Sequence, residues 1–409
     1  MHRKISSRLF LIGCEVYTGF LRYPCATNSV CATIPCWALR LNSILSQTEP
    51  ILRPVMPELD SIRGIAILGV VFYHEFYSVG MGTTLSHWQH LLVLAAWPGR
   101  MGVNLFFVLS GFLITGILLK SCSEKKYYKR FYARRALRIF PIYLLLLLIL
   151  AALGYPQKFL LLSLIYLSNM VQLFGVPLAY GVLWSLAVEE HFYLIWPFMV
   201  KKLSQRNLGI LAVAIILISP LIRLIGLRWA KPGDEEWLFY TWNTMDGLAV
   251  GAFLALFIRW TNSDRQSLSR ACWASVALAT LLWGIGIPFG IVSARRPLGA
   301  VLQTVPWQFL SFAILGGCLL LGTTRWRFLV RSGVLAFYGY ISYGLYLIHT
   351  LVFDWSDRWN IRRYLPGFGH GPFADILVRL AYFGFLATAI AWLSRKYFEE
   401  LFLRRKPTA

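Results

Sequence analysis

The chain has 409 residues, of which 57% are hydrophobic and only 14% are charged. Soluble domains carry about 25% charged residues, so this composition excludes an ordinary soluble protein and indicates a membrane protein with several spans. The formal net charge of +22 would suggest a nucleic-acid partner in a soluble domain. Here the basic residues gather in short loops between apolar segments, which is typical of cytoplasmic loops, and we exclude nucleic acid as a partner.

Residues 1–55 differ from the rest of the chain. Their one apolar run, "LFLIGCEVYTGFL", is short, is interrupted by Glu15 and lacks a small-residue cleavage site, so it does not predict a signal peptide. Met56 opens "MPELDSIRGIAIL", a natural start for a first span. We expect residues 1–55 to be an over-extended start or a disordered tail, with a real domain as the alternative. None of the seven cysteines has C-x-x-C or zinc-ligand spacing, so no disulfide framework and no metal site are predicted.

Eleven hydrophobic segments follow Met56. A helix needs about 20 apolar residues to cross the hydrocarbon core of a membrane, and continuous runs without alternation favour helices over the strands of a barrel. In chain order the candidates cover residues 61–79, 102–119, 136–153, 159–174, 183–200, 208–226, 240–258, 272–292, 306–322, 337–353 and 375–394.

The basic loops decide which of these segments cross. Residues 120–138 carry eight lysines and arginines, which places this loop and the N-terminus in the cytoplasm. If all eleven segments crossed, the basic residues 201–206 and 323–333 and the C-terminus would lie outside. A re-entrant or partly buried segment at 159–174 removes all three conflicts. We therefore predict an all-α integral membrane protein of the bacterial cytoplasmic (inner) membrane, with about ten transmembrane helices in a domain spanning 56–396, a basic cytoplasmic tail at 397–409 and both termini inside.

The first span, "RGIAILGVVFYH", begins with Arg63 and ends with His74. The two residues are eleven positions apart, close to three helical turns, so they share one helix face about 16 Å apart. Ionisable residues at membrane depth are functional candidates because burying them is costly. Arg63 and His74, with Glu75 beside it, therefore predict a polar channel partway through the membrane. The alternative is that Arg63 extends to the lipid headgroups and that His74 caps the helix.

Three further segments carry polar residues at helical spacing. Ser185 lies four residues before Glu189, so the two share a face, whereas the adjacent Glu190 cannot share it. Taken singly, such residues are also explained by hydrogen bonds between helices. Together they predict a polar cavity enclosed by several helices, with these positions as its members: Ser185, Glu189, Asp246, Ser342, Tyr346 and His349.

These stretches, in this order, resemble the membrane-bound acyltransferase family 3, whose members O-acylate bacterial polysaccharides, peptidoglycan, Nod factors and macrolides. The resemblance runs from about residue 57 to residue 395. The matching motifs are Arg63 with ten residues before His74, "FFVLSGFLI", "RRALRIFP", "LWSLAVEEHFYLIWP" and "ISYGLYLIH".

The resemblance implies transfer of an acyl group, commonly acetyl, from cytoplasmic acyl-coenzyme A to a hydroxyl of a saccharide, a lipid-linked saccharide or another cell-envelope acceptor. It marks Arg63, His74, Arg135 and Arg138 as essential, and acyl-coenzyme A as a co-substrate rather than a bound cofactor. Some members continue into an extracytoplasmic esterase-like domain, and this chain is expected to be a stand-alone transferase.

The residues fit this chemistry. The planar guanidinium of arginine binds phosphate with two hydrogen bonds, so Arg63, Arg135 and Arg138 are expected to hold the phosphates of coenzyme A, with a purely topogenic role as the alternative. Neutral His74 is suited to take a proton from the acceptor hydroxyl, and Glu189 is expected to orient its imidazole. A covalent acyl-histidine intermediate stays open.

Two points remain open at the level of sequence. The loops 227–240 and 354–371 mix tryptophan with charged residues, a composition that suits a saccharide site and an interfacial aromatic belt equally. A secondary transporter of a small polar solute would also bury such residues, although the sequence has no internal repeat and no matched pair of broken spans.

Overall fold

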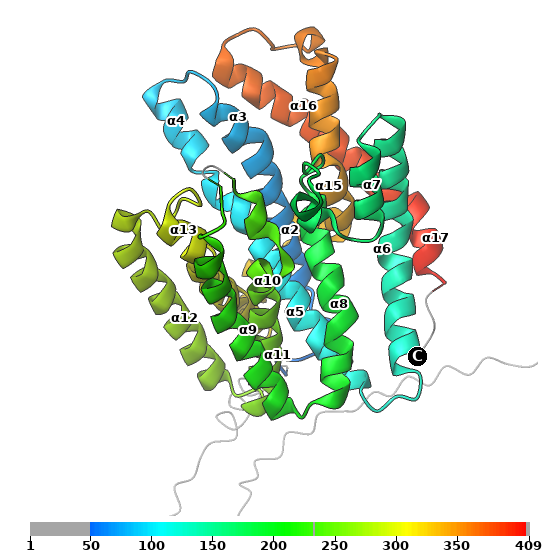
Figure 1. Cartoon of the computed structure of the whole chain (residues 1–409), viewed down its shortest axis with the longest axis vertical. Coiled ribbons are helices and arrows are strands. Elements are labelled where there is room, and N and C mark those ends of the chain that lie inside the picture. Colours follow the sequence, from blue (N-terminus) through cyan, green and yellow to red (C-terminus); the bar gives the residue numbers. More distant parts are fainter. Residues whose placement is uncertain (1–49, 232–233, 406–409) are drawn as a thin grey trace, which may run out of the picture. The chain divides into compact units, whose positions relative to one another are not determined.

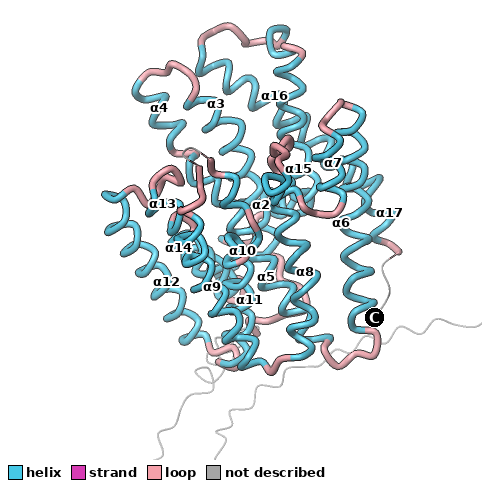
Figure 2. Tube along the Cα trace, in the orientation of Figure 1, coloured by secondary structure: helices cyan, strands magenta, loops and turns pink. Residues whose placement is uncertain are grey.

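The computed structural model describes residues 50–231 and 234–405, and every regular element in these ranges is a helix (Figure 2). The predicted N-terminal tail lies mostly outside the described residues, and its nature stays a prediction. Its last few residues are described. Ile51 is buried in the core and Arg53 pairs with the carboxylate of Glu58.

The long helices follow the predicted spans closely (Figure 1). The first span is α2 (Glu58–Phe72), which continues through the π-helical turn η1 (Tyr73–Tyr77) into α3 (Ser78–Met81). The others are α5 (Gly102–Ser121), α6 (Tyr127–Ala152), α8 (Leu183–Lys202), α9 (Gln205–Gly226), α10 (Thr241–Thr244) with α11 (Asp246–Trp260), α12 (Arg265–Gly286), α14 (Val305–Leu321), α15 (Gly333–Arg358) and α16 (Pro372–Leu393).

Short helices connect them. They are α4 (His87–Leu94), α7 (Gln157–Leu164), α13 (Pro297–Leu302) and α17 (Glu400–Leu403), together with the 3-10 segments η2 (Trp97–Met101), η3 (Ser168–Phe174), η4 (Glu236–Phe239), η5 (Ile287–Phe289), η6 (Arg325–Leu329) and η7 (Ile361–Tyr364). A π-helical segment, η8 (Ser394–Glu399), joins α16 to α17.

Among the described residues, eight helices are long and apolar enough to cross a membrane. The prediction of an all-α integral membrane protein is therefore confirmed. The two other predicted crossings coincide with α8, whose 20 residues include two glutamates and two lysines, and with α10 and α11, of which α11 has 15 residues. The charged residues make α8 too polar, and its length makes α11 too short, to be counted among the eight by length and composition alone.

As predicted, the segment 159–174 is not a helix that crosses the membrane. Its helix α7 has eight residues, about 12 Å at 1.5 Å per residue, too short for the hydrocarbon core. The polar end of the segment then turns onto its neighbours. Ser168 donates to the Leu183 carbonyl at 2.9 Å, and the Asn169 amide donates to Thr241 Oγ1 at 2.9 Å. The segment therefore packs its polar residues inside the protein.

Several basic connections gather at one end of the helices. Figure 1 shows the loops from α5 to α6, from α8 to α9 and from α11 to α12 together at its lower edge. Arg331, in the connection from α14 to α15, pairs with Glu58 at the start of α2. Ten crossings place all these connections on one side. Which side of the membrane this is stays a prediction.

The predicted C-terminal tail begins inside a helix. Beyond residue 396 the chain remains helical to Leu403, Glu399 is buried, and Tyr340 on α15 donates to the Glu400 carboxylate. Helical structure therefore continues beyond residue 396, and the division of the chain at 397 stays a prediction.

Glycines bring two pairs of helices close together around the site. A Cβ at Gly339 on α15 would lie 1.9 Å from the Asp60 carbonyl of α2, and a Cβ at Gly111 on α5 would lie 1.9 Å from the Leu248 carbonyl of α11. Small residues permit such contacts between backbones in a membrane. The Gly339 contact thus brings α15 against α2, and the Gly111 contact brings α11 against α5.

Candidate active site

A cavity lies between α2, α5, α6, α8 and α15. We call it the arginine cavity. Seven predicted site residues line it: Arg63, Arg135, Arg138, Ser185, Glu189, Ser342 and Tyr346.

The arginines enter from the half of each helix that is nearer the basic connections. Arg63 pairs with Asp60 one turn earlier on α2. Arg135 places its guanidinium 4.9 Å from the centre of the Tyr193 ring, and the side chain of Arg138 is exposed to the cavity. Within the described part of the chain, neither Arg135 nor Arg138 forms an ion pair. The cavity is lined by three arginines and one carboxylate, that of Glu189, so its excess of positive charge favours an anionic ligand.

Glu189 does not meet His74, contrary to its predicted orienting role. Its carboxylate accepts hydrogen bonds from Ser110 Oγ at 2.9 Å and from the Tyr193 hydroxyl at 3.1 Å. The hydroxyl oxygens of Ser110 and Tyr193 lie 2.8 Å apart. The three polar groups thus contact one another on the cavity wall. Neither partner was predicted from the sequence, although Tyr193 lies four residues after Glu189, on its helix face. Glu189 is therefore a fixed acceptor in the cavity.

Ser185 and Tyr346 meet deeper in the cavity. The serine hydroxyl of α8 lies 2.5 Å from the tyrosine hydroxyl of α15. Ser342, one turn before Tyr346, also lines the cavity and donates to the Gly339 carbonyl of its own helix at 2.8 Å. The predicted polar stripe of α15 thus faces this space.

His74 lies beside His349 rather than on the cavity wall. The two rings are 5.4 Å apart between centres, and the His349 ring is 6.0 Å from that of Tyr346. The prediction that Arg63 and His74 line one continuous channel is therefore only half met, because Arg63 lines the cavity and His74 lies behind Tyr346 and His349. Straight α-helical spacing also ends at Phe72, since the π-helical turn η1 contains His74, and π-turns often mark functional sites.

The protonation of His349 follows from its partners. The side chain is 0% exposed, and its Nδ1 lies 2.8 Å from the Tyr346 carbonyl and 3.1 Å from the Leu345 carbonyl. Carbonyl oxygens only accept, so Nδ1 carries the proton and Nε2 is an acceptor. Among the described residues this Nε2 has no hydrogen-bond partner. His349 therefore presents a buried acceptor close to the ring of His74.

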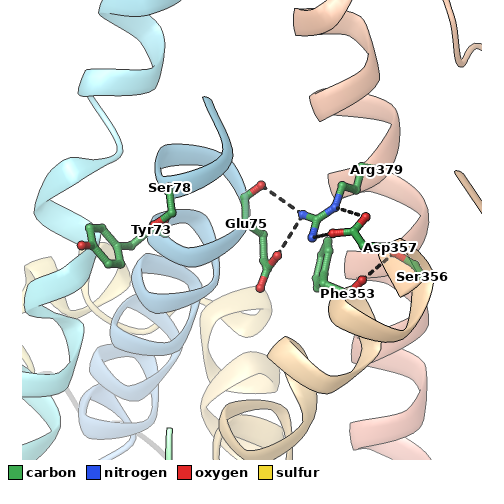
Figure 3. A network of polar contacts seen from close by, with 7 residues as sticks. All are labelled: Tyr73, Glu75, Ser78, Phe353, Ser356, Asp357 and Arg379. Atoms are coloured by element: carbon green, nitrogen blue, oxygen red, sulfur yellow. Dashed lines mark hydrogen bonds and ion pairs between the residues drawn. The ribbon is translucent and has the colours of Figure 1, made fainter. Parts of the chain in front are cut away.

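Glu75 does not belong to the polar cavity, contrary to prediction. Figure 3 shows its carboxylate facing Arg379 of α16, with Nη1 at 2.9 Å from Oε2. The same nitrogen lies 3.4 Å from the Glu75 carbonyl, and Nη2 of Arg379 is 2.8 Å from Asp357 Oδ2. The guanidinium also lies 4.6 Å from the centre of the Phe353 ring. Arg379 thus ties the π-helical turn that carries His74 to α15 and α16. Sequence reasoning singled out neither Arg379 nor Asp357.

Asp246 is likewise outside the arginine cavity, contrary to prediction. It forms an ion pair with Arg223 of α9 at 3.0 Å, and both side chains are almost completely buried. Arg223 also donates to the carbonyls of Val301 at 2.8 Å and Asn243 at 2.5 Å. The structure therefore agrees with the alternative interpretation, a polar contact between helices, because Asp246 balances the buried charge of Arg223.

Comparison with known proteins agrees with the motifs. The family model of an acyltransferase domain matches residues 56–395. The peptidoglycan O-acetyltransferase OatA of Listeria monocytogenes is 31% identical over 173 residues, which are 37% of this chain and 25% of that relative. A protein of Bacillus subtilis named provisionally as a peptidoglycan O-acetyltransferase is 28% identical over 307 residues, which are 68% of this chain and 41% of the relative.

A protein of Staphylococcus aureus named provisionally as an O-acetyltransferase is 25% identical over 362 residues, which cover 80% of this chain and 55% of the relative. The chain thus spans about half the length, or less, of these curated relatives. No solved structure matches it. Since the family match covers most of the chain and includes every motif of the resemblance, the protein belongs to the acyltransferase family that its sequence predicted.

Proposed function

We propose that the protein is a membrane O-acyltransferase that moves an acyl group, acetyl in the first instance, from acyl-coenzyme A to a hydroxyl of a saccharide or another cell-envelope acceptor. The observation that carries this proposal is the arginine cavity, in which Arg135 and Arg138 have no ion-pair partner among the described residues. Coenzyme A brings phosphates that would balance them, with Arg63 as a third donor.

The relatives support the acceptor. Two of them are named for O-acetylation of peptidoglycan, a polymer of the cell envelope. In our proposal the protein resides in the bacterial cytoplasmic membrane with both termini inside, so that the basic connections and the cavity arginines face the cytoplasmic pool of acyl-coenzyme A. The acceptor then arrives from the opposite side.

In the proposed reaction the acceptor oxygen attacks the thioester carbonyl. A carbon–oxygen bond forms, the carbon–sulfur bond breaks, and coenzyme A leaves as a thiolate. His74 takes the proton of the hydroxyl and passes it to that thiolate, which is general base and then general acid catalysis. His349, whose ring lies 5.4 Å from that of His74, takes the place that was predicted for Glu189 beside the imidazole. Direct attack is the simpler course, and an acyl-histidine intermediate would require His74 itself to attack first.

The decisive experiment uses the full chain in lipid nanodiscs with radiolabelled acetyl-coenzyme A and a panel of hydroxylated acceptors. Wild-type protein is expected to move the label onto an acceptor. His74→Ala is expected to lower this rate by about 10²–10⁴-fold while the protein remains folded. His87→Ala, which removes an exposed histidine of α4, serves as the matched control and retains the wild-type rate.

Three results would overturn the proposal. The first is a full rate in His74→Ala, which removes the base. The second is the absence of any label transfer across the panel. The third is flux of a solute across proteoliposomes without consumption of thioester, which would support the transporter alternative.

A further inference from the structure

A second hollow lies where α9 ends. It has about 920 Å³ of empty space and is bounded by η3, the last turns of α9 and the chain that leads into α10. Four aromatic side chains line it: Trp229, Trp237, Tyr240 and Trp242. We call it the aromatic pocket. The helix α9 begins at the end of the protein that holds the basic connections (Figure 1), so this pocket lies toward the opposite end.

Polar groups are prearranged on the same wall. The Gln172 amide donates to Asp234 Oδ2 at 2.7 Å, and the Tyr240 hydroxyl donates to Gln172 Oε1 at 3.3 Å. Asn243 is buried and donates to the Trp237 carbonyl at 2.8 Å, whereas its Oδ1 is buried without a hydrogen-bond partner among the described residues. A buried acceptor without a donor is costly unless a ligand or water supplies one.

The arrangement of the four aromatic rings favours a binding site over an interfacial belt. A belt places aromatic residues around the perimeter at the headgroup level. Here four rings from one short stretch converge on one hollow. Trp237 packs down against α9, where a Cβ at Gly226 would lie 2.7 Å from its ring. Trp229 stays 73% exposed, so that a ligand can cover it.

Ring contacts connect the aromatic pocket to the arginine cavity. Phe239, the neighbour of Tyr240, stacks on Trp184 of α8 with centres 4.4 Å apart. Trp184 meets the edge of Phe107 at 5.8 Å, and Phe107 lines the arginine cavity. The partly buried segment 159–174 supports this wall, since the Asn169 amide donates to the Phe239 carbonyl at 3.1 Å. Three aromatic side chains in contact thus lead from the neighbour of Tyr240 to the wall of the arginine cavity.

We infer that the aromatic pocket binds a saccharide unit of the acceptor, with its tryptophan faces against the sugar ring and with Asn243 Oδ1, Asp234 and Gln172 facing the sugar hydroxyls. A sugar presents an apolar face and a rim of hydroxyl donors, which this combination of rings and acceptors matches. Lys231 and Asp234 both line the pocket and carry opposite charges, so the pocket suits a sugar without net charge. The inference rests on the proposed function for its link to acyl transfer.

The test uses the full chain in nanodiscs with a tetramer of N-acetylglucosamine as the saccharide probe. Calorimetric titration without acetyl-coenzyme A measures binding, and labelled acetyl-coenzyme A measures transfer. Trp229→Ala removes an exposed ring and is expected to weaken binding and to raise the KM for the saccharide about tenfold, which equals about 1.4 kcal/mol. The KM for acetyl-coenzyme A and kcat remain unchanged. Trp88→Ala is the matched control, because Trp88 on α4 is 77% exposed and lies outside the pocket.

The outcomes distinguish this inference from the proposed function. Binding that is weakened in Trp229→Ala but kept in Trp88→Ala supports the pocket even if no acceptor in the panel receives the label. Saccharide transfer by the wild type with equal binding and equal KM in both variants overturns the inference and leaves the acyltransferase proposal intact. Absence of saccharide binding to the wild type overturns the inference as well.

Discussion

Two pairs of arginines inside the helical domain differ in what lies against them. Arg223 and Arg379 lie against carboxylates of neighbouring helices, at 3.0 Å from Asp246 and 2.9 Å from Glu75. Arg135 and Arg138 face the arginine cavity, and among the described residues no carboxylate pairs with them. The first group joins helices to one another. The second group leaves its charge available to a molecule from outside.

The comparison shows that an ionisable residue in a membrane helix is not evidence of chemistry by itself. Each such charge is costly unless something balances it, and the identity of the balancing group distinguishes a structural residue from a binding residue. Removing a paired arginine should therefore lower stability, whereas removing a cavity arginine should lower affinity for an anionic substrate.

The largest effect is expected at the pair of Arg223 and Asp246. Arg223→Ala leaves a fully buried carboxylate without its cation and should lower the free energy of unfolding by about 3–5 kcal/mol. Thermal unfolding in detergent measures this loss. The double variant R223Q/D246N removes both charges and should recover part of it. A single variant as stable as the wild type would contradict the structural role of the pair.

Arg138→Gln should instead leave unfolding unchanged and raise the KM for acetyl-coenzyme A about 10- to 100-fold. Hydrogen bonds to charged groups contribute about 1.5–3 kcal/mol, and this loss falls on substrate binding because no partner inside the protein loses its charge balance. Steady-state kinetics measures the change. Lys129→Gln, an exposed lysine of the adjacent basic loop, is the control. Equal effects in both variants would favour a general topogenic role.

Arg379 should affect the catalytic rate as well as stability, because it holds the π-helical turn that contains His74. Arg379→Gln is expected to lower kcat about tenfold by displacing the imidazole, while the KM for acetyl-coenzyme A stays constant, since Arg379 lies outside the arginine cavity. Arg379→Lys keeps the charge and should restore part of kcat. A loss of stability with an unchanged kcat would reduce Arg379 to a purely structural residue.

The smallest effect is expected for Tyr346→Phe. This change removes one hydrogen bond, that with Ser185 at 2.5 Å, and such a bond contributes about 1 kcal/mol, so kcat should fall about fivefold. Tyr382→Phe, an exposed tyrosine of α16, should have no effect. If Ser185→Ala lowered kcat to a different extent, the two hydroxyls would act separately rather than as a pair.

The sequence by itself determined the helices and much of the arginine cavity. Apolar runs of sufficient length are helices in a membrane because the backbone must satisfy its own hydrogen bonds there. Charge in the loops excluded the segment 159–174 as a crossing, and helical spacing placed Ser342 and Tyr346 on one face. These properties are local, so they can be read from neighbouring residues.

Only the tertiary structure decided which acidic residues face the cavity. A sequence pattern cannot distinguish Glu75, Glu189 and Asp246, because each is a carboxylate in an apolar helix. Their roles depend on partners from other helices, such as Arg379, which lies 304 residues from Glu75 in the chain. Packing also placed His349 of α15 beside His74. The sequence had predicted Glu189 of α8 in this position. Charge balance inside a membrane is a property of the assembled helices, and no single helix contains it.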